Sequence, residues 1–319
     1  MKTPSSPHAS AASNQTPDHL TRDFVGYGAT PPHADWPDGA RLALNFVVNY
    51  EEGSESSIPD GDGISEGSLT ESPDSPNGPG SRDLAAESMY EYGTRVGFWR
   101  VLKLFEDRGL PATVNACALA LERNHDAAQA MRAAQWDVCC HGWRWIEHWT
   151  LSEDEEREHI RKAVASLERT MGQTPRGWYC RHGPSVNTRR LIVEHGGFLY
   201  DSDSYADDLP YWTEVGETPH LVVPYSLAVN DSKFARNHFS RGDDYVSFLC
   251  DAIDFLVEEG AQTPRMMSCG LHLRLIGHPA RAAALARVLD HVAGRKDIWV
   301  TRRVDIARHW MERHPFTAR

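Results

Sequence analysis

Short apolar runs alternate with amphipathic patterns along most of this 319-residue chain. Beginning near Arg41, runs of aliphatic and aromatic residues bounded by turn residues predict strands, and the longer stretches between them predict helices. The predicted strands are LALNFVVN (42–49), ATVNAC (112–117), DVCC (137–140), GWYC (177–180), FLYD (198–201), HLVVPYS (220–226), RMMSCGLH (265–272) and IWVT (298–301).

The clearest predicted helix runs from about Glu153 to Met171. Ser152 is placed to cap its first turn, Glu155 completes a capping box, and Gly172 ends it. We expect further helices to follow Glu91, Asn187, Gly242, Pro279 and Arg303.

The order of these elements predicts the fold class. Continuously apolar strands separated by helices indicate a parallel sheet that is covered on both faces. Repetition of this unit predicts an α/β fold, a closed or nearly closed (β/α) barrel that forms a single domain over residues 21–319. An open, doubly wound sheet is the alternative.

Two segments depart from the pattern. Residues 1–20 are rich in Ser, Pro and Ala, which predicts a disordered tail. Residues 53–83, GSESSIPDGDGISEGSLTESPDSPNGPGSRD, directly follow the first predicted strand. This insertion is either a solvated loop or a lid over the mouth of the barrel.

Charge and cysteine content narrow the possible partners. The 33 Lys and Arg residues against 45 Asp and Glu residues give a formal charge of -12, which repels nucleic acids and anionic membranes. The first twenty residues contain no apolar run long enough for a signal peptide, so we expect a cytoplasmic protein. The six cysteines form no CxxC pair, and we interpret them as buried free thiols.

Polar side chains lie at nearly every predicted strand end, where the chemistry of a (β/α) barrel is found. Successive side chains of a strand face opposite sides, which places Glu51 with Asn49 inside the barrel. The same count places His272 inside with Ser268 and Gly270, whose small side chains leave room for a ligand. The other polar strand-end residues are Glu52, Asn115, His141, Arg181, His182, Asp201, Asp203 and Arg274.

Several of these strand-end segments resemble the successive motifs of the polysaccharide deacetylase superfamily. More narrowly, RDFVGYG, NYEEG, YEYGTR, HGWRW, TRRL, FLYDSDSYADDLPYW, GLHLRLIG and DIARHW resemble its cofactor-independent allantoinase branch. The resemblance covers residues 22 to about 310. It implies a distorted (β/α) barrel of the polysaccharide deacetylase type, a homo-oligomer, and the conversion of allantoin to allantoate in purine catabolism.

The motifs depart from those of the metal-dependent relatives. Those enzymes carry two aspartates in the first motif and two histidines, four residues apart, in the second. Here the acids are Glu51 and Glu52, His141 remains, and Trp145 stands at the second histidine position. Since indole cannot ligate zinc, we expect no metal and no other cofactor, with a divalent metal such as zinc as the alternative.

The resemblance assigns roles to the strand-end residues. Glu51 takes the position of the base that activates water, and His272 that of the acid that protonates the departing nitrogen. The negative charge that develops on the carbonyl oxygen of the substrate would be stabilised by His141, Arg181 or backbone N–H groups. A small cyclic amide substrate would lie between these groups and the remaining predicted substrate-binding residues, Glu52, Asn115, Trp145, Tyr179, Asp201 and Asp203.

Three alternatives stay open from the sequence. The loop after Tyr179, CRHGPSVN, departs from the allantoinase pattern, so another cyclic ureide or imide is a possible substrate. A metal-dependent deacetylase of N-acetylated sugars is the second alternative. A barrel that binds a ureide or a partner without catalysis is the third. Arg181 has a structural alternative too, as the ion-pair partner of Asp201 or Asp203.

Overall fold

The computed structural model describes residues 20–72, 77–181 and 183–318. His182 and all but the last residue of the predicted tail therefore lie outside the described residues. The strands form one sheet in the spatial order β6-β7-β5-β4-β3-β2-β1-β8, with β9 pairing the first part of β1. Their bounds are β1 Leu42–Tyr50, β2 Thr113–Ala116, β3 Asp137–Cys140, β4 Gly177–Trp178, β5 Tyr200–Asp201, β6 Tyr211–Val215, β7 Thr218–Val222, β8 Arg265–His272 and β9 Ile298–Val300.

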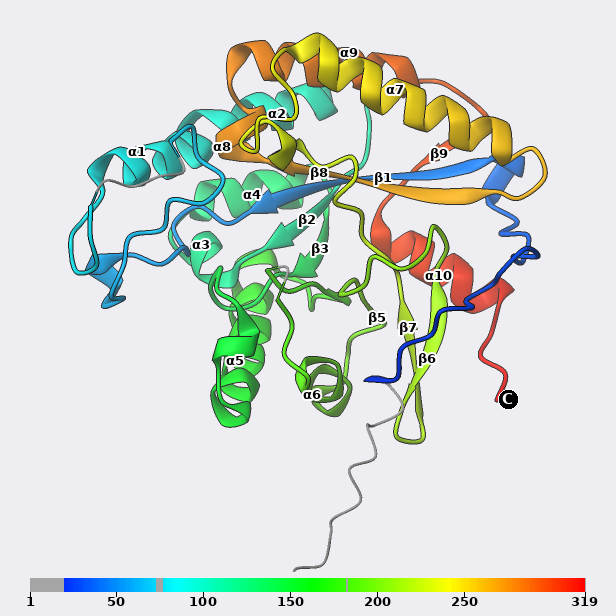
Figure 1. Ribbon diagram of the computed structural model, residues 1–319, viewed down its shortest axis with the longest axis horizontal. Helices are drawn as coiled ribbons and strands as arrows, with labels where there is room; N and C mark the ends of the chain where they lie inside the picture. The colour runs from blue at the N-terminus through cyan, green and yellow to red at the C-terminus, as the bar shows by residue number, and fades with distance from the viewer. Residues whose placement is uncertain (1–19, 73–76, 182, 319) are drawn as a thin grey trace, which may run out of the picture.

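The sheet is curled into a distorted half-barrel, which confirms the predicted (β/α) fold (Figure 1). Every pairing is parallel except the β6–β7 hairpin, so the carboxyl ends of the parallel strands meet on one side. The long pair β1–β8 runs in register from Leu42 opposite Arg265 to Asn49 opposite His272. These two strands carry the central residues of the site.

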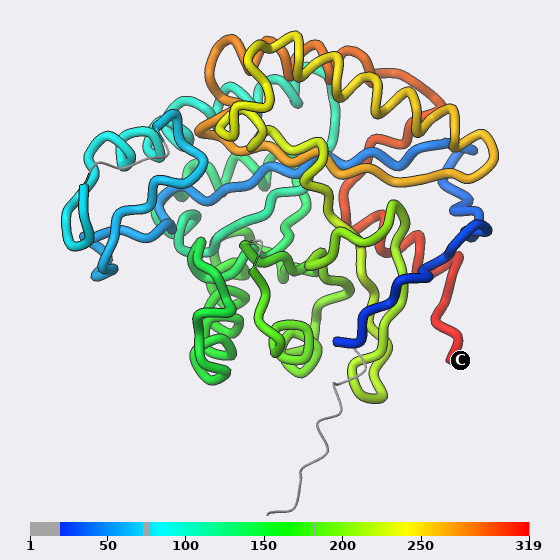
Figure 2. The backbone as a smooth tube through the Cα atoms, viewed as in Figure 1, coloured from blue at the N-terminus to red at the C-terminus, as the bar shows by residue number. Residues whose placement is uncertain are grey.

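Helices cover the outside of the curled sheet, except for α10, which packs with the inner-face residues Ala43 and Val47 (Figures 1 and 2). Their bounds are α1 Leu84–Tyr92, α2 Phe98–Glu106, α3 Ala118–Glu122, α4 His125–Ala133, α5 Glu153–Met171, α6 Thr188–His195, α7 Gly242–Glu259, α8 Leu273–Ile276, α9 Pro279–Val292 and α10 Arg303–Arg313. The Ser152–Glu155 capping box and the left-handed Gly172 confirm the prediction for α5.

The predicted alternation of side chains along β1 is confirmed. Leu44, Phe46 and Val48 belong to the core between sheet and helices. Ala43 and Val47, which point to the other face, pack with Tyr179 and Tyr225 inside the curl. Burial on both faces explains why the strand is apolar at nearly every position.

Several elements differ from the sequence prediction. The helix placed after Glu91 begins seven residues earlier as α1, passes through a π-helical turn at Gly93–Gly97, and continues as α2. Helices α3 and α4 and strand β6 were not predicted. Strand β6 is half-exposed and mixes aromatic and polar residues, so its sequence lacks the apolar run that marks the buried strands.

The insertion at 53–83 packs against the barrel in its described part, beside the carboxyl ends of the strands. Four of its acidic side chains form ion pairs with arginines outside it, and Thr70 is buried. This arrangement favours the lid over a solvated loop. The pairs are Asp60–Arg123, Asp62–Arg144, Glu66–Arg181 and Glu71–Arg281.

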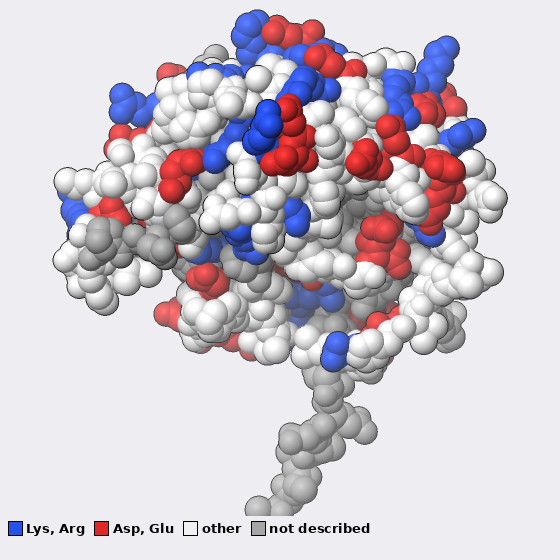
Figure 3. Space-filling model, turned by 45° about the horizontal axis from the view of Figure 1, so that its top comes forward, with Lys and Arg blue, Asp and Glu red and all other residues white. Residues whose placement is uncertain are grey.

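Two further expectations concern the surface and the thiols. Figure 3 shows acidic and basic side chains interspersed on one face of the molecule. Among the described residues, no helix has both the length and the apolar character needed to cross a bilayer. All six cysteines are free, and all but Cys250 are buried, as the sequence predicted.

Candidate active site

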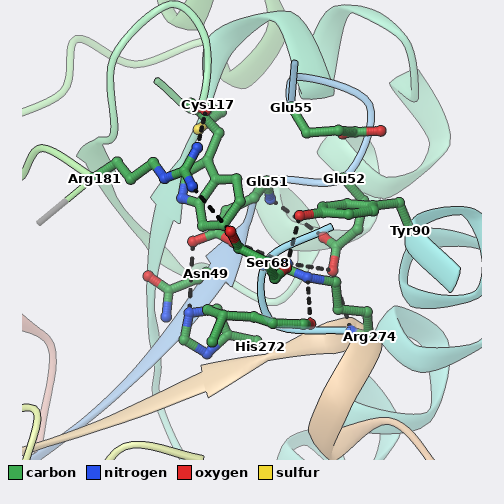
Figure 4. A network of polar contacts seen from close by, with 12 residues as sticks. Asn49, Glu51, Glu52, Glu55, Ser68, Tyr90, Cys117, Arg181, His272 and Arg274 are labelled. Carbon is green, nitrogen blue, oxygen red and sulfur yellow. Dashed lines mark hydrogen bonds and ion pairs between the residues drawn. The ribbon is translucent and has the colours of Figure 1, made fainter. Parts of the chain in front are cut away.

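Glu51 lies just beyond the carboxyl end of β1 and is the centre of a buried polar cluster (Figure 4). Its side chain is 1 % exposed, and its Oε1 lies 3.3 Å from His141 Nε2 and 3.6 Å from His272 Nε2. Burial alone would raise the pKa of Glu51, but the charge of Arg274, followed by His272 and His141, holds it well below its usual range. The carboxylate is therefore ionised and faces two imidazoles.

His272 ends β8 and is oriented by Asp231. The ring Nδ1 donates to Asp231 Oδ1 at 2.6 Å, and the backbone N–H of His272 donates to Oδ2 at 2.7 Å. This leaves Nε2 facing Glu51. Burial lowers the pKa of His272, but the negative charges of Glu51 and Asp231 outweigh burial and raise it above its usual value.

His141 follows β3 and is fixed from the opposite side. Its Nδ1 lies 2.6 Å from the carbonyl oxygen of Tyr179, which can only accept, so Nδ1 carries the hydrogen and Nε2 faces Glu51. The Tyr179 ring stacks on the imidazole at 5.1 Å with an angle of 6° between the planes. The structure thus brings together Glu51, His141, His272 and Tyr179, as the sequence predicted.

Arg274, on α8, is bonded to both acids at the end of β1. Its Nη1 lies 2.8 Å from Glu51 Oε2 and 3.3 Å from Glu52 Oε1, and its backbone N–H donates to Glu52 Oε1 at 3.1 Å. Burial and, more weakly, the charge of Glu51 raise the pKa of Glu52, against the opposing charge of Arg274. The pKa of Glu52 is therefore above its ordinary value even though the carboxyl contacts a guanidinium.

Gly93 allows the π-helical turn to approach this cluster. A Cβ atom at this position would lie 2.9 Å from the backbone nitrogen of Arg274 and closer still to Glu52 Oε1. Only glycine fits such a close approach without displacing the acid. Close packing therefore explains the glycine of the motif YEYGTR. π-Helical turns often lie at functional sites.

Trp145 and Arg181 lie on the insertion side of the cluster. The Arg181 guanidinium stacks 3.7 Å from the Trp145 ring and binds Glu66 Oε2 at 2.6 Å and Glu147 Oε1 at 3.3 Å. The alternative that Arg181 pairs with Asp201 or Asp203 is therefore wrong. Glu66 belongs to the insertion at 53–83, and the sequence does not show that the insertion lies beside the end of β4, where Arg181 is found.

Asp201 and Asp203 form a separate cluster beside strand β4. Asp201 accepts from Arg189 Nε at 2.6 Å and from His220 Nε2 at 3.1 Å, so protein groups already occupy its oxygens. Asp203 accepts from the backbone N–H of Cys180 at 2.8 Å. Burial, followed by the charge of Asp201, raises the pKa of Asp203 to about 7.

The amide of Asn115 donates to Asn49 Oδ1 at 3.0 Å, and Asn49 in turn lies opposite His272 on the neighbouring strand. The room expected beside Gly270 is not free, because a Cβ there would collide with Tyr225 Oη and Asn230 Nδ2. Ser268 likewise bonds to Arg303. A ligand must therefore enter nearer the strand ends.

The residues present do not fit a divalent metal. A guanidinium already lies between Glu51 and Glu52, and the Trp145 ring stands 4.8 Å from it. The nearest following histidine in the sequence, His148, bonds through Nδ1 to Glu156 at 3.1 Å. The described residues contain no group of three or more His, Cys, Asp or Glu side chains that could hold a metal.

Sequence reasoning placed Arg274 at a strand end but gave it no role, and it missed Asp231. Arg274 belongs to the motif GLHLRLIG, but its partners Glu51 and Glu52 come from another strand. Asp231 lies in the loop between β7 and α7, far from any predicted strand end. No local pattern marks such contacts, which arise when segments distant in sequence meet.

Comparison with known proteins identifies the family of this chain. The sequence pattern described as polysaccharide deacetylase matches residues 83–200. The chain is 38% identical to a Schizosaccharomyces pombe protein named "Putative polysaccharide deacetylase", over 93% of this chain and 99% of that protein.

Two crystal structures resemble the chain closely. A "probable Polysaccharide deacetylase" from Pseudomonas aeruginosa shares 49% identity with a TM-score of 0.89, and "Puue Allantoinase" shares 50% identity with a TM-score of 0.88. Each comparison covers 93% of this chain and 99% of the other. The chain therefore belongs to the polysaccharide deacetylase family of hydrolases, which act on carbon–nitrogen bonds.

Proposed function

We propose that this protein opens the ring of a small cyclic amide by hydrolysis, with allantoin as the first substrate to test and allantoate as the product. The observation that carries the proposal is the position of the ionised Glu51 between two imidazoles, one of them backed by Asp231. The identity shared with an allantoinase over most of both chains supports the choice of substrate.

The arrangement provides a base and an acid for addition of water to a ring amide. Glu51 removes a proton from water, and the hydroxide oxygen bonds to the carbonyl carbon. When the C–N bond breaks, protonated His272 donates its Nε2 hydrogen to the departing nitrogen. The proton held by Glu51 then returns to His272 or to solvent, which restores both groups.

The proposed reaction uses no metal and no other cofactor. Glu51 is kept ionised by Arg274 and the neighbouring imidazoles, so the base is present as carboxylate at neutral pH. The position that would need a histidine ligand carries Trp145, which contacts two guanidinium groups instead. Negative charge that develops on the substrate oxygen would be stabilised by the positive groups around Glu51.

Other predicted residues would bind and orient the substrate. We propose that Tyr179 and Trp145 line the pocket of a planar ring together with the imidazole and guanidinium groups that stack on them. Asn115 and Asp203 would bond to ring and ureido N–H groups. We also propose that Glu52, Arg181 and Asp201 shape the pocket through their ion pairs. We expect the protein to work in the cytoplasm. We also expect a homo-oligomer, and light scattering would measure its molar mass.

A second candidate is deacetylation of N-acetylated sugars. The names of the relatives from Schizosaccharomyces pombe and Pseudomonas aeruginosa favour this reaction. It breaks an acyclic amide, and in metal-dependent family members it needs a metal that the residues around Glu51 do not fit. We therefore rank it second.

One assay series separates the two candidates. Purified protein is tested on allantoin, hydantoin, dihydrouracil, succinimide and N-acetylglucosamine oligomers, with and without a chelator, and its zinc content is measured. We expect ring opening that the chelator does not change. Turnover of the acetylated sugar alone, lost on chelation and restored by zinc, would contradict the proposal.

A further inference from the structure

Arg274 is buried among groups that suit a cation. Its side chain is 0 % exposed, and Nε donates to the carbonyl oxygen of Leu69, in the insertion, at 3.0 Å. The ring faces of Tyr90 and Trp145 lie 4.5 Å and 4.8 Å from its Cζ. Aromatic faces attract a cation through their quadrupole, most strongly where water is excluded.

The same guanidinium bridges two buried carboxylates that adjoin in sequence. Glu51 and Glu52 are both nearly inaccessible to water, and two like charges so close repel each other strongly at low dielectric. Arg274 Nη1 lies within 3.3 Å of an oxygen of each, so a single cation compensates both acids. Figure 4 shows Arg274 reaching from the end of β8 toward this pair.

We infer that Arg274 is a built-in cation of this site, a positioning residue that holds Glu51 beside His272 and occupies the space that a divalent metal would need. The inference rests on the proposed function only where it calls Glu51 the base. Exclusion of a metal by a fixed guanidinium concerns binding alone, so zinc binding tests it without a measurement of enzyme activity.

The first experiment replaces the guanidinium and then returns it. In Arg274→Ala we expect kcat for ring opening to fall at least about 100-fold with a smaller change in KM, since orientation of a catalytic group is lost. Millimolar guanidinium should restore part of kcat, and urea, which has the same shape without charge, should not. Restoration by neither, or equally by both, overturns the positioning role.

Three further variants guard this experiment against misfolding. Arg303→Ala removes another buried guanidinium far from Glu51, and guanidinium should not raise its kcat. Arg274→Lys keeps a charge in the site, whereas Arg274→Gln does not, so the lysine variant should retain more activity. Equal loss in these two variants would contradict the role of the charge.

The second experiment measures zinc binding directly. Trp145→His places an imidazole near Glu52 but leaves Arg274, so we expect no stoichiometric zinc after dialysis against the metal. The double variant Trp145→His/Arg274→Ala should bind zinc at least about tenfold more tightly, because the competing charge is gone. If both variants bind zinc equally, the guanidinium does not exclude metal. If the wild-type protein opens no ring, the proposed function fails, yet this zinc comparison still decides whether Arg274 excludes a metal.

Discussion

Two arginines are buried in the curled sheet in opposite surroundings. Arg274 lies at the carboxyl ends of the strands and contacts the carboxylates of Glu51 and Glu52. Arg303, the first residue of α10, reaches the inside of the sheet about 20 Å earlier along β1, at the level of Asn45. Within the described chain its partners are neutral: Asn45 Oδ1, the hydroxyls of Ser202 and Ser268, and the carbonyl oxygens of Val223 and Pro224.

The difference shows how surroundings decide what a buried charge does. Hydroxyls and carbonyls do not titrate near neutral pH, so the bonds of Arg303 join β1, β8 and the segment after β7 without moving any proton. Carboxylates and imidazoles do titrate, and beside them Arg274 sets which groups carry protons. We therefore expect changes around Arg303 to alter stability and changes around Arg274 to alter chemistry.

The largest effect is expected for Glu51→Gln. The amide cannot remove a proton from water, so kcat should fall by about 10³-fold. The protein should stay folded, because Glu52 still pairs with Arg274. Steady-state kinetics and the melting temperature, measured on the same preparation, check both statements. A fully active variant would show that Glu51 is not the base.

The next effect is on stability, for Arg303→Ala. The substitution leaves a cavity and several buried acceptors without a donor, and should lower the free energy of unfolding by about 3–5 kcal/mol. Activity per folded molecule should stay near the wild-type value. Urea unfolding measures the loss, and Arg302→Ala, which breaks a partly exposed pair with Asp305, should cost about 0–1 kcal/mol. Equal losses of unfolding free energy in both variants would contradict the structural role of Arg303.

The smallest effect is on pH dependence, for Asp231→Asn. Activity requires ionised Glu51 and protonated His272, so kcat/KM should fall as pH rises through the raised pKa of His272, above its ordinary value of about 6.5. Loss of the Asp231 charge should move this alkaline limb to lower pH by about one unit.

The same variant has a stability signature. A histidine with a raised pKa stabilises the fold fully at low pH, and this contribution is lost as pH rises through that pKa. Asp231→Asn should reduce the contribution. Ser268→Ala, which changes a neutral partner of Arg303, should leave the kcat/KM profile unchanged. An alkaline limb that stays in place in Asp231→Asn would exclude His272 as the acid.

The strands that are buried on both faces could be predicted, because such strands are apolar at nearly every position and this pattern is local in the sequence. The inward direction of Glu51 and His272 followed from counting along β1 and β8, which contain no bulge in their shared register. The β6–β7 hairpin could not be predicted this way. Strand β6 is half-exposed and carries mixed side chains, so its pairing with β7 and the turn at Gly216 define it.

The sequence by itself determined the family, the barrel, and the central trio of Glu51, His141 and His272, since these depend on local alternation and on motifs at strand ends. The tertiary structure alone decided the partners of the charges. Arg181 binds Glu66 in the insertion. Asp231 contacts His272 across more than forty residues of sequence, and Arg274 contacts Glu51 across more than two hundred. Such contacts have no local signature, because an ion pair depends on the distance between side chains and not on the spacing along the chain.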